Sequence, residues 1–221
     1  MISIAIDGPS SAGKSTMAKK IAEKLGYIYV DTGALYRSIG LYAVRMGADT
    51  NAQNEITPLL SNIKIDLKHI DGVQRILLNG EDVSEEIREP QMSMAASNVS
   101  AIGAVREFLL DMQKDIAKSN NIIMDGRDIG TVVLPKAQVK IFLTATADER
   151  AKRRYNEFIS KGMDVKYENI LADIIQRDYN DSNRPIAPLK KADDAIEFDT
   201  TKLNCQEVVD GLIKIIEEKI K

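Results

Sequence analysis

The amino-acid sequence contains very few residues of the kinds that build disulfides, zinc sites or imidazole catalysis. Its 221 residues include one cysteine, Cys205, one histidine and no tryptophan. A lone cysteine excludes an intrachain disulfide and a cysteine-based zinc site. We therefore expect a reduced, soluble, cytoplasmic protein.

Long apolar runs and an excess of one charge are also missing. No apolar run approaches the roughly 18 residues of a membrane span, and the N-terminus reaches an acid, Asp7, without a basic region. We expect neither a membrane span nor a signal peptide. The 30 Lys and Arg against 33 Asp and Glu give a net charge of −3. Proteins that bind nucleic acid or anionic membranes usually carry a basic excess, so we expect neither partner.

The composition is typical of one globular domain with room for an insert. Hydrophobic residues make up 44% and charged residues 29% of the chain, which are ordinary values for a globular protein. At roughly 150 residues per domain, the length of 221 residues corresponds to one domain and part of a second.

Short apolar runs alternate with helical patterns through most of the chain. A run rich in isoleucine stops at Asp7, a glycine-rich turn follows, and apolar residues then recur at helical spacing up to Gly26. The pattern predicts a second strand over 27–30 and a second helix over 33–46. This order indicates a parallel α/β sheet flanked by helices.

Residues 60–90 do not follow this alternation of strand and helix patterns. Ile63, Ile65 and Leu67 alternate with polar residues, and Asp71-Gly72 and Asn79-Gly80 are strong hairpin-turn pairs. We expect an antiparallel insert of about three strands.

The α/β pattern resumes after the insert. It predicts helices over 99–116, from 146 onward and around 170–175, strands at 122–124, 139–144 and 195–198, and a C-terminal helix around 208–216. Residues 181–192 contain Pro185 and Pro188 without an apolar period, which predicts a loop.

The turn after the first strand carries the clearest functional motif. Gly8-Pro9-Ser10-Ser11-Ala12-Gly13-Lys14-Ser15 fits the P-loop pattern G-x-x-x-x-G-K-[ST] in full. Its glycines let backbone N–H groups approach a phosphate, and the helix N-terminus adds positive potential. We expect residues Gly8 to Thr16 to bind a nucleoside triphosphate, with Lys14 on the β/γ-phosphates and Ser15 on Mg²⁺.

Arginines cluster in the second half of the chain. Six lie between residues 127 and 184, namely Arg127, Arg150, Arg153, Arg154, Arg177 and Arg184. Arginine binds phosphate oxygens in a bidentate manner, so the cluster indicates phosphates on two substrates. The sequence has no Asn-Lys-x-Asp guanine motif, which argues against a GTPase.

Four sequence blocks together resemble the bacterial cytidylate kinases of the nucleoside monophosphate kinase superfamily. They are the P-loop, Asp31-Thr32-Gly33-Ala34-Leu35-Tyr36-Arg37, Asp125-Gly126-Arg127-Asp128-Ile129-Gly130-Thr131-Val132-Val133 and Arg177-Asp178-Tyr179-Asn180-Asp181-Ser182-Asn183-Arg184. The insert near 60–90 matches the longer bacterial form. The resemblance implies one P-loop kinase domain over 1–221 with an α/β three-layer fold, a monophosphate-binding region at 32–100 and a helical lid at 147–190.

The resemblance also implies the residues of the acceptor site. The family's CMP-binding residues fall on Thr32, Arg37, Ser97, Arg106, Arg127, Asp128, Arg177 and Asp181. Arg37 and Arg127 match residues that hold the acceptor phosphate, and Thr32 stands where the family often has serine. Arg177 and Asp181 match residues that reach the ribose, although four residues apart they could equally form an ordinary helix ion pair.

Ser97, Arg106 and Asp128 match the residues with which the family recognises cytosine. A carboxylate such as Asp128 can accept a hydrogen bond from N4 of cytosine, whereas O4 of uracil is itself an acceptor. Arg106 could orient that carboxylate, and its alternative is an ordinary solvated helix residue.

The implied reaction transfers the γ-phosphoryl of ATP to CMP or dCMP. The acceptor is a phosphate oxygen that is already ionised near neutral pH, so no general base is needed and catalysis becomes alignment and charge neutralisation. We expect Lys14, Arg127, Arg154 and Arg184 to be catalytic, with Arg150 and Arg153 left open. Mg²⁺ is the expected cofactor, held by Ser15 and, through water, by Asp125.

Three other functions remain compatible with parts of the sequence. The first is a related kinase acting on UMP, dTMP or shikimate. The second is a regulatory module that hydrolyses a nucleoside triphosphate slowly, which would leave the acceptor-side arginines unexplained. The third is a nucleic-acid-binding ATPase, which the net charge disfavours. For the kinase, we expect a monomer.

Overall fold

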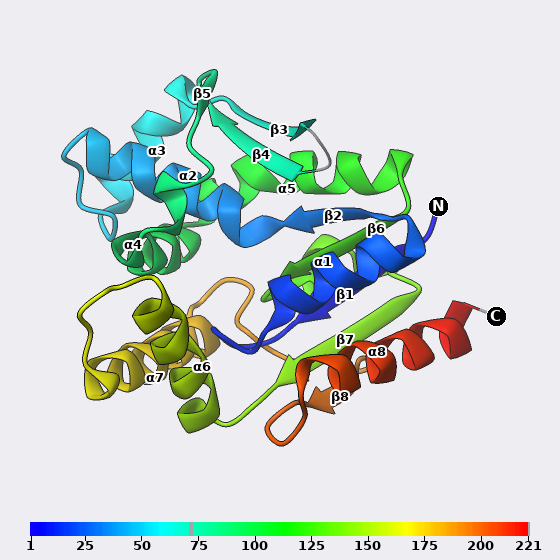
Figure 1. The fold of residues 1–221 in the computed structure, drawn as a ribbon. Coiled ribbons are helices and arrows are strands. Elements are labelled where there is room, and N and C mark those ends of the chain that lie inside the picture. The colour runs from blue at the N-terminus through cyan, green and yellow to red at the C-terminus, as the bar shows by residue number, and fades with distance from the viewer. Residues whose placement is uncertain (71–72, 221) are drawn as a thin grey trace. The chain divides into compact units, whose positions relative to one another are not determined.

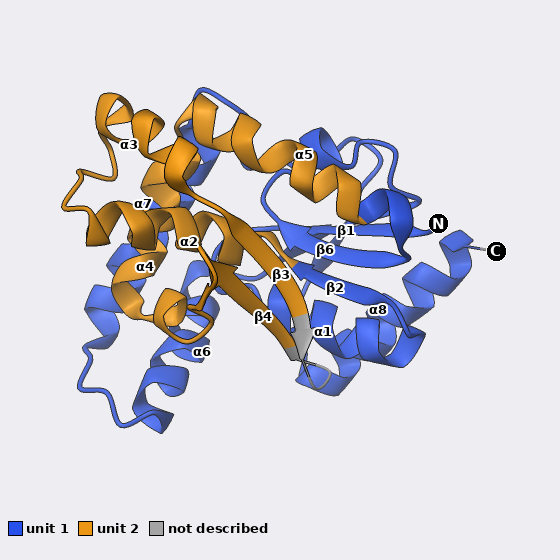
Figure 2. Ribbon diagram, turned by 90° about the horizontal axis from the view of Figure 1, so that it is seen from above, with its two compact units in different colours: residues 1–30, 117–221 blue, residues 31–116 orange. Residues whose placement is uncertain are grey.

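The structure is a computed structural model that describes residues 1–70 and 73–220 (Figure 1). The chain forms two compact units, which Figure 2 shows in different colours. Unit 1 is built from Met1–Val30 and Ala117–Lys221, and unit 2 from Asp31–Ile116. No helix in the described part of the chain is both long enough and apolar enough to cross a membrane.

A five-stranded sheet forms the centre of unit 1. Its strands are β1 (Ser3–Asp7), β2 (Ile28–Asp31), β6 (Ile122–Gly126), β7 (Val139–Thr144) and β8 (Ile196–Asp199), in the order β2-β6-β1-β7-β8. The central strand β1 pairs in parallel with both β6 and β7. Its residues Ile4, Ala5 and Ile6 are completely buried, as expected for a strand covered on both faces. The predicted α/β fold with a parallel sheet is confirmed.

Helices pack against this sheet and also form a small core of their own. Helices α1 (Lys14–Leu25) and α8 (Cys205–Ile220) share one apolar cluster with β1 and β7. Helices α6 (Ala147–Ser160) and α7 (Tyr167–Asn183) are held together by a separate cluster of Ala151, Phe158, Ile170 and Ile174. The segment predicted as a lid therefore has its own apolar core.

Unit 2 combines helices with an antiparallel sheet. Its helices are α2 (Thr32–Arg45), α3 (Gln53–Leu59), α4 (Pro90–Ser100) and most of α5 (Gly103–Ser119), with short 3₁₀ turns at Leu60–Asn62 and Glu86–Arg88. Its strands are β3 (Ile65–Ile70), β4 (Val73–Leu78) and β5 (Glu81–Asp82), in sequential order. The predicted three-stranded insert is confirmed. Asn79 and Gly80 both have positive φ, as a type I′ hairpin turn requires, while the turn predicted at Asp71-Gly72 lies outside the described residues.

Two predicted boundaries are wrong, for identifiable reasons. The helix predicted over 99–116 is interrupted, because α4 ends at Ser100 and α5 begins at Gly103. The loop predicted over 181–192 begins only at Arg184, since α7 continues to Asn183. A proline disfavours helical geometry for the residue before it and not for residues further upstream, and Arg184, which precedes Pro185, is the first extended residue. The sequence analysis also predicted no helix over 53–59 or over 90–98, where α3 and most of α4 lie.

Candidate active site

The P-loop joins β1 to α1, and two glycines determine its shape. At Gly8 a Cβ would lie 2.0 Å from the carbonyl oxygen of Leu143 on β7, so no side chain fits. Gly13 is the N-cap of α1 with a φ of 90°, in the left-handed region that favours glycine. Because glycine offers no side-chain cap, the first N–H groups of α1 can bind an anion such as phosphate.

Lys14 is buried and folded back onto its own loop. Its Nζ donates a hydrogen bond to the carbonyl oxygen of Pro9 at 2.7 Å. Burial lowers the pKa of the Lys14 ammonium well below its ordinary value, and the nearby Arg127 guanidinium lowers it further, while Asp125 and Asp7 act in the opposite direction. The charges of Arg127, Asp125 and Asp7 thus all act on the P-loop lysine.

The beginning of α1 and the end of β6 bring oxygen atoms together. The Ser15 hydroxyl donates to Oδ2 of Asp125 at 2.8 Å, and the Tyr29 hydroxyl donates to Oδ1 of the same carboxylate, also at 2.8 Å. Mg²⁺ prefers oxygen ligands and is often bound by one or two protein groups together with substrate phosphates and water. The hydroxyl of Ser15 and the carboxylate of Asp125 fit that kind of site. Among the described residues, no group of three or more His, Cys, Asp or Glu could hold a metal alone.

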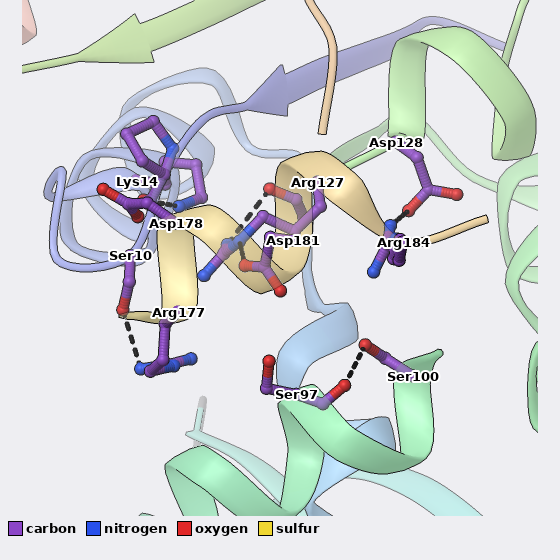
Figure 3. Close-up of polar contacts among 12 residues, drawn as sticks. Ser10, Lys14, Ser97, Ser100, Arg127, Asp128, Arg177, Asp178, Asp181 and Arg184 are labelled. Atoms are coloured by element: carbon purple, nitrogen blue, oxygen red, sulfur yellow. Dashed lines mark hydrogen bonds and ion pairs between the residues drawn. The ribbon is translucent and has the colours of Figure 1, made fainter. Parts of the chain in front are cut away.

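Arg127 is paired with Asp181, which helix α7 carries. The Arg127 Nε donates to Oδ2 of Asp181 at 2.8 Å, and the close-up in Figure 3 shows the two side chains directed at each other. Burial would raise the pKa of Asp181, but the positive charges of Arg127 and Arg177 outweigh it and hold this pKa below its usual range. Asp181 is therefore an ionised carboxylate that fixes the Arg127 guanidinium.

Ser10 of the P-loop is bound by arginines from both α6 and α7. Arg177 donates through NH1 to the Ser10 hydroxyl at 2.7 Å (Figure 3), and Arg150 donates through NH1 to the Ser10 carbonyl at 2.9 Å. Arg150 is itself fixed by Asp178, which accepts from its NH2 at 2.6 Å. Arg177 and Asp181 both lie on α7, as their spacing suggested. Hydrogen bonds join Arg177 to Ser10 and Asp181 to Arg127.

The remaining lid arginines have different surroundings. Arg184, the C-cap of α7, donates to Oδ1 of Asp128 at 3.2 Å and to the carbonyl of Ala187 at 2.6 Å. The Arg154 guanidinium lies 4.7 Å from the centre of the Phe158 ring. Arg153 is bound to Glu149 and to Thr200, a residue between β8 and α8.

The other predicted acceptor residues belong to unit 2; they are Thr32, Arg37, Ser97 and Arg106. Asp31 caps α2 by accepting from the Ala34 N–H at 2.9 Å and also accepts from Arg37 NH2 at 2.9 Å, with Thr32 buried beside it in sequence.

Ser97 and Arg106 are linked through Ser100. The Ser100 hydroxyl donates to the Ser97 carbonyl at 2.8 Å, and Arg106 donates through NH1 to the Ser100 carbonyl at 3.2 Å. Both Ser97 and Arg106 are buried, so Arg106 is not the solvated helix residue that was its alternative.

Three polar residues that bind predicted site residues were not assigned a role from the sequence. Asp7, Tyr29 and Asp31 each bind a predicted site residue or its neighbouring backbone. Asp7 and Asp31 share a signal that could have been used, because each is an acid directly after an apolar run. At the carboxyl end of a parallel strand such an acid lies at the edge where ligands bind.

Comparison with known proteins identifies close relatives of the chain. A family model described as cytidylate kinase matches residues 4–218. A cytidylate kinase from Caldicellulosiruptor saccharolyticus is 53% identical over 214 residues, which cover 97% of this chain and 95% of the relative. A cytidylate kinase from Bacillus subtilis is 47% identical over 218 residues, covering 99% and 97% respectively.

Solved structures with the same fold are more distant in sequence. A shikimate kinase from Bacteroides thetaiotaomicron has a TM-score of 0.50 at 14% identity, with 98% of this chain and 97% of that chain covered. An uncharacterised protein from Eubacterium ventriosum has a TM-score of 0.52 at 14% identity, with 98% and 99% covered. At this identity the likeness concerns the fold alone.

Proposed function

The chain belongs to the cytidylate kinase family, and from this premise we propose that it transfers the γ-phosphoryl of ATP to CMP or dCMP, giving ADP and CDP or dCDP. One observation carries the proposal beyond the family name. Within unit 1, helix α7 connects the P-loop to Arg127, the arginine that the sequence assigns to the acceptor phosphate, because Asp181 accepts from Arg127 and Arg177 donates to Ser10. Phosphoryl transfer between two phosphates needs cations at both reacting groups.

The reaction is an in-line displacement at the γ-phosphorus. A phosphate oxygen of CMP forms a bond to this phosphorus while the bond to the β,γ-bridging oxygen of ATP breaks, and ADP leaves. The attacking oxygen is already ionised, so no residue has to remove a proton. The P-loop N–H groups and Lys14 hold the donor phosphates, and Arg127 with Arg37 holds the acceptor phosphate. Catalysis then consists of alignment and of neutralising charge on the transferred group.

Recognition of the acceptor is assigned to residues of both units. Ser97 and Arg106 with Asp128 would contact the cytosine, and the carboxylate of Asp128 would accept from N4. Arg177 and Asp181 would contact the ribose hydroxyls. Support comes from the link between Ser97 and Arg106 through Ser100 and from the ionised state of Asp181.

Mg²⁺ is the proposed cofactor. Ser15 would hold it through its hydroxyl and Asp125 through a water molecule, consistent with the oxygen donors that these residues bring together. When bound, the ion supplies positive charge to the phosphates of ATP.

The segment 147–190 is proposed to act as a lid, within one kinase domain whose monophosphate-binding region is 32–100. Its helices have an apolar core of their own, and Arg150 and Arg177 connect them to Ser10 of the P-loop. Closure of such a segment would exclude water, which would otherwise hydrolyse ATP. Arg154 and Arg184 are the arginines proposed to stabilise the transferred phosphoryl group.

The test is release of ADP from Mg·ATP in a coupled assay with CMP, dCMP, UMP, dTMP, AMP, GMP, shikimate or no acceptor. Fast turnover restricted to CMP and dCMP is expected. Preference for another acceptor would keep the phosphoryl chemistry and overturn the assignment of Ser97, Arg106 and Asp128. Slow release that ignores every acceptor would indicate a regulatory NTPase instead of a kinase.

We also propose that the enzyme acts as a monomer in the cytoplasm. The support is the family resemblance and the single cysteine, which suits a reducing compartment. Light scattering at micromolar concentration, with and without nucleotides, tests the monomer, and cell fractionation tests the location.

A further inference from the structure

We propose that Asp7 and Lys140 are positioning residues that hold the backbone following Arg127 and Asp128, so that the Asp128 carboxylate stays directed away from its own helix, as its proposed contact with cytosine requires. This inference rests on the proposed function and concerns how the same site selects its acceptor. It is carried by hydrogen bonds within unit 1 that join β1 and β7 to the segment 127–135.

Asp7 is the last residue of β1 and directly precedes the P-loop. Its carboxylate is buried, and both of its oxygens accept backbone hydrogen bonds, Oδ1 from Ile129 at 2.8 Å and Oδ2 from Gly130 at 2.7 Å. One side chain thus connects the start of the donor-phosphate loop to the backbone immediately after Asp128.

The backbone that Asp7 binds is an unusual helix. Residues Ile129–Val133 form a π-helix with Asp128 as its N-cap, and the Leu134 N–H bonds to the Ile129 carbonyl at 2.6 Å. Such helices are rare and occur frequently at functional sites. The first N–H groups of any helix have no partner inside the helix and need one from outside.

Asp128 would be the ordinary source of that partner. Aspartate is among the preferred N-cap residues because its carboxylate accepts from the second or third N–H of the helix. Here the side chain of Asp128 makes no capping bond and instead accepts from Arg184. Asp7 supplies the cap from a neighbouring strand, and Asp128 bonds to Arg184 and not to its own helix.

Lys140 on β7 holds the other end of the segment. Its Nζ donates to the carbonyl oxygen of Pro135 at 2.7 Å and to Asp194 at 2.9 Å. Gly130 lies between the two positioning residues, since a Cβ there would be 3.3 Å from Oδ2 of Asp7 and 3.1 Å from Cδ of Lys140. The segment is therefore fixed near its start by Asp7 of β1 and at its end by Lys140 of β7, and both side chains lie close to Gly130.

The consequence concerns selection between acceptors. An asparagine at residue 7 keeps one acceptor oxygen, so either the Ile129 or the Gly130 N–H is left buried without a partner, which is costly. As the N-cap residue, Asp128 can take over the bond from Gly130, and rotation toward its own helix would remove it from the cytosine. Loss of Asp7 should therefore reduce preference for CMP over UMP and leave ATP binding intact.

The test compares Asp7→Asn with Asn121→Ala. Asn121 also accepts from a backbone N–H, that of Ile2 at 2.8 Å, but at the amino end of the sheet. For D7N we expect the ratio of kcat/KM for CMP to that for UMP to fall about tenfold, the scale of one hydrogen bond to a charged group. The dissociation constant of a non-hydrolysable ATP analogue should stay within about twofold of the parent value. N121A should lower Tm and leave both quantities unchanged.

A double-mutant cycle with Asp128→Asn distinguishes positioning from a general loss of order. If Asp7 acts through Asp128, D7N should have no further effect on the CMP to UMP ratio in the D128N background. A further fall in that background would overturn the inference, as would an unchanged ratio in D7N alone. Lys140→Met should lower the CMP to UMP ratio of kcat/KM in the same direction but less than D7N does. If D7N fails to fold, the measurement is made on this variant. If the parent protein does not phosphorylate CMP, the proposed function itself has failed, which is a separate outcome.

Discussion

At the residue scale, two carboxylates determine where two of the arginines of unit 1 point. Asp181 accepts from Arg127, and Asp128 accepts from Arg184. Arginine side chains have many rotamers, and fixing one of them on binding costs entropy. A carboxylate that restricts the guanidinium beforehand reduces this cost. Asp181 and Asp128 thus have a conformational role in addition to the ribose and cytosine contacts proposed for them.

The first prediction concerns Asp181. In Asp181→Asn the Arg127 guanidinium loses the charge that fixes it, so the KM for CMP should rise about tenfold or more, the scale of a hydrogen bond to a charged group. The KM for ATP should change by less than about threefold. Steady-state kinetics with each substrate varied in turn gives both values, and equal changes would contradict the proposed role of Asp181 at the acceptor.

The second prediction concerns Lys14. Lys14→Ala should lower kcat by about a hundredfold or more, because this ammonium would neutralise charge on the transferred group. Lys24→Ala is the matched control, since Lys24 lies on the same helix with its side chain half exposed and should keep the parent kcat. A near-normal kcat in K14A would show that Lys14 does not stabilise the transition state.

The place of the P-loop in the fold could be predicted from the sequence because its motif fixes residue types at close spacing. The P-loop lies between a strand and a helix as its pattern requires. The partners of the arginines could not be predicted in the same way. Arg127 and Asp181 are 54 residues apart, and Arg177 and Ser10 are 167 residues apart. Such pairs form only when whole helices and strands pack together, and sequence spacing does not predict that packing.

At the element scale, the connection from β1 to α1 is shaped by the strand beside it. The Leu143 carbonyl on β7 occupies the space that a side chain at residue 8 would need. At Gly13, by contrast, only the positive φ disfavours a side chain, since no atom lies within 4 Å of the position that a Cβ would take.

This difference gives the third prediction. Gly13→Ala should cost about 1–2 kcal/mol of unfolding free energy, the usual penalty for the left-handed region. Gly8→Ala should cost more than that, because β7 must move as well. Urea unfolding followed by far-UV circular dichroism measures both values, and a smaller loss in G8A than in G13A would be inconsistent with the close approach of Leu143.

The elements that were predicted correctly have strong local patterns. The strand ending at Asp7 contains the apolar run Ile4-Ala5-Ile6, and Asn79-Gly80 forms the predicted turn. The helix α4 was missed because its buried side chains are mostly small or polar, among them Ala95, Ser97 and Ser100, which gives little apolar periodicity. The π-helix at Ile129–Val133 has no sequence signature, since its cap comes from Asp7.

At the scale of the whole molecule, a buried acid couples stability to pH. Burial raises the pKa of Asp7 to about 6, although the N–H groups of Gly130 and Ile129 act to lower it. Asp128 raises this pKa further and Lys14 lowers it. At neutral pH the carboxylate is therefore ionised at a cost to the folded state.

The fourth prediction follows from the sign of this shift. The folded chain binds a proton at Asp7 below about pH 6, whereas the unfolded chain binds it only near 3.8. The contribution of Asp7 to the unfolding free energy should therefore fall as the pH rises from 4 to 6, by at most about 3 kcal/mol. Urea unfolding of the parent and of D7N across pH 4–7.5 isolates this contribution. Parallel pH curves for the two proteins would contradict the raised pKa.

The division of the chain into two units has a consequence for biosynthesis. Unit 2 is continuous, from Asp31 to Ile116, whereas unit 1 is completed only by residues that follow it. The central strand β1 pairs with β6 and β7, so on the ribosome this isoleucine-rich strand leaves the exit tunnel long before either neighbour has been translated. We expect unit 2 to fold first during synthesis. The nascent P-loop strand should then be the segment that chaperones bind for longest.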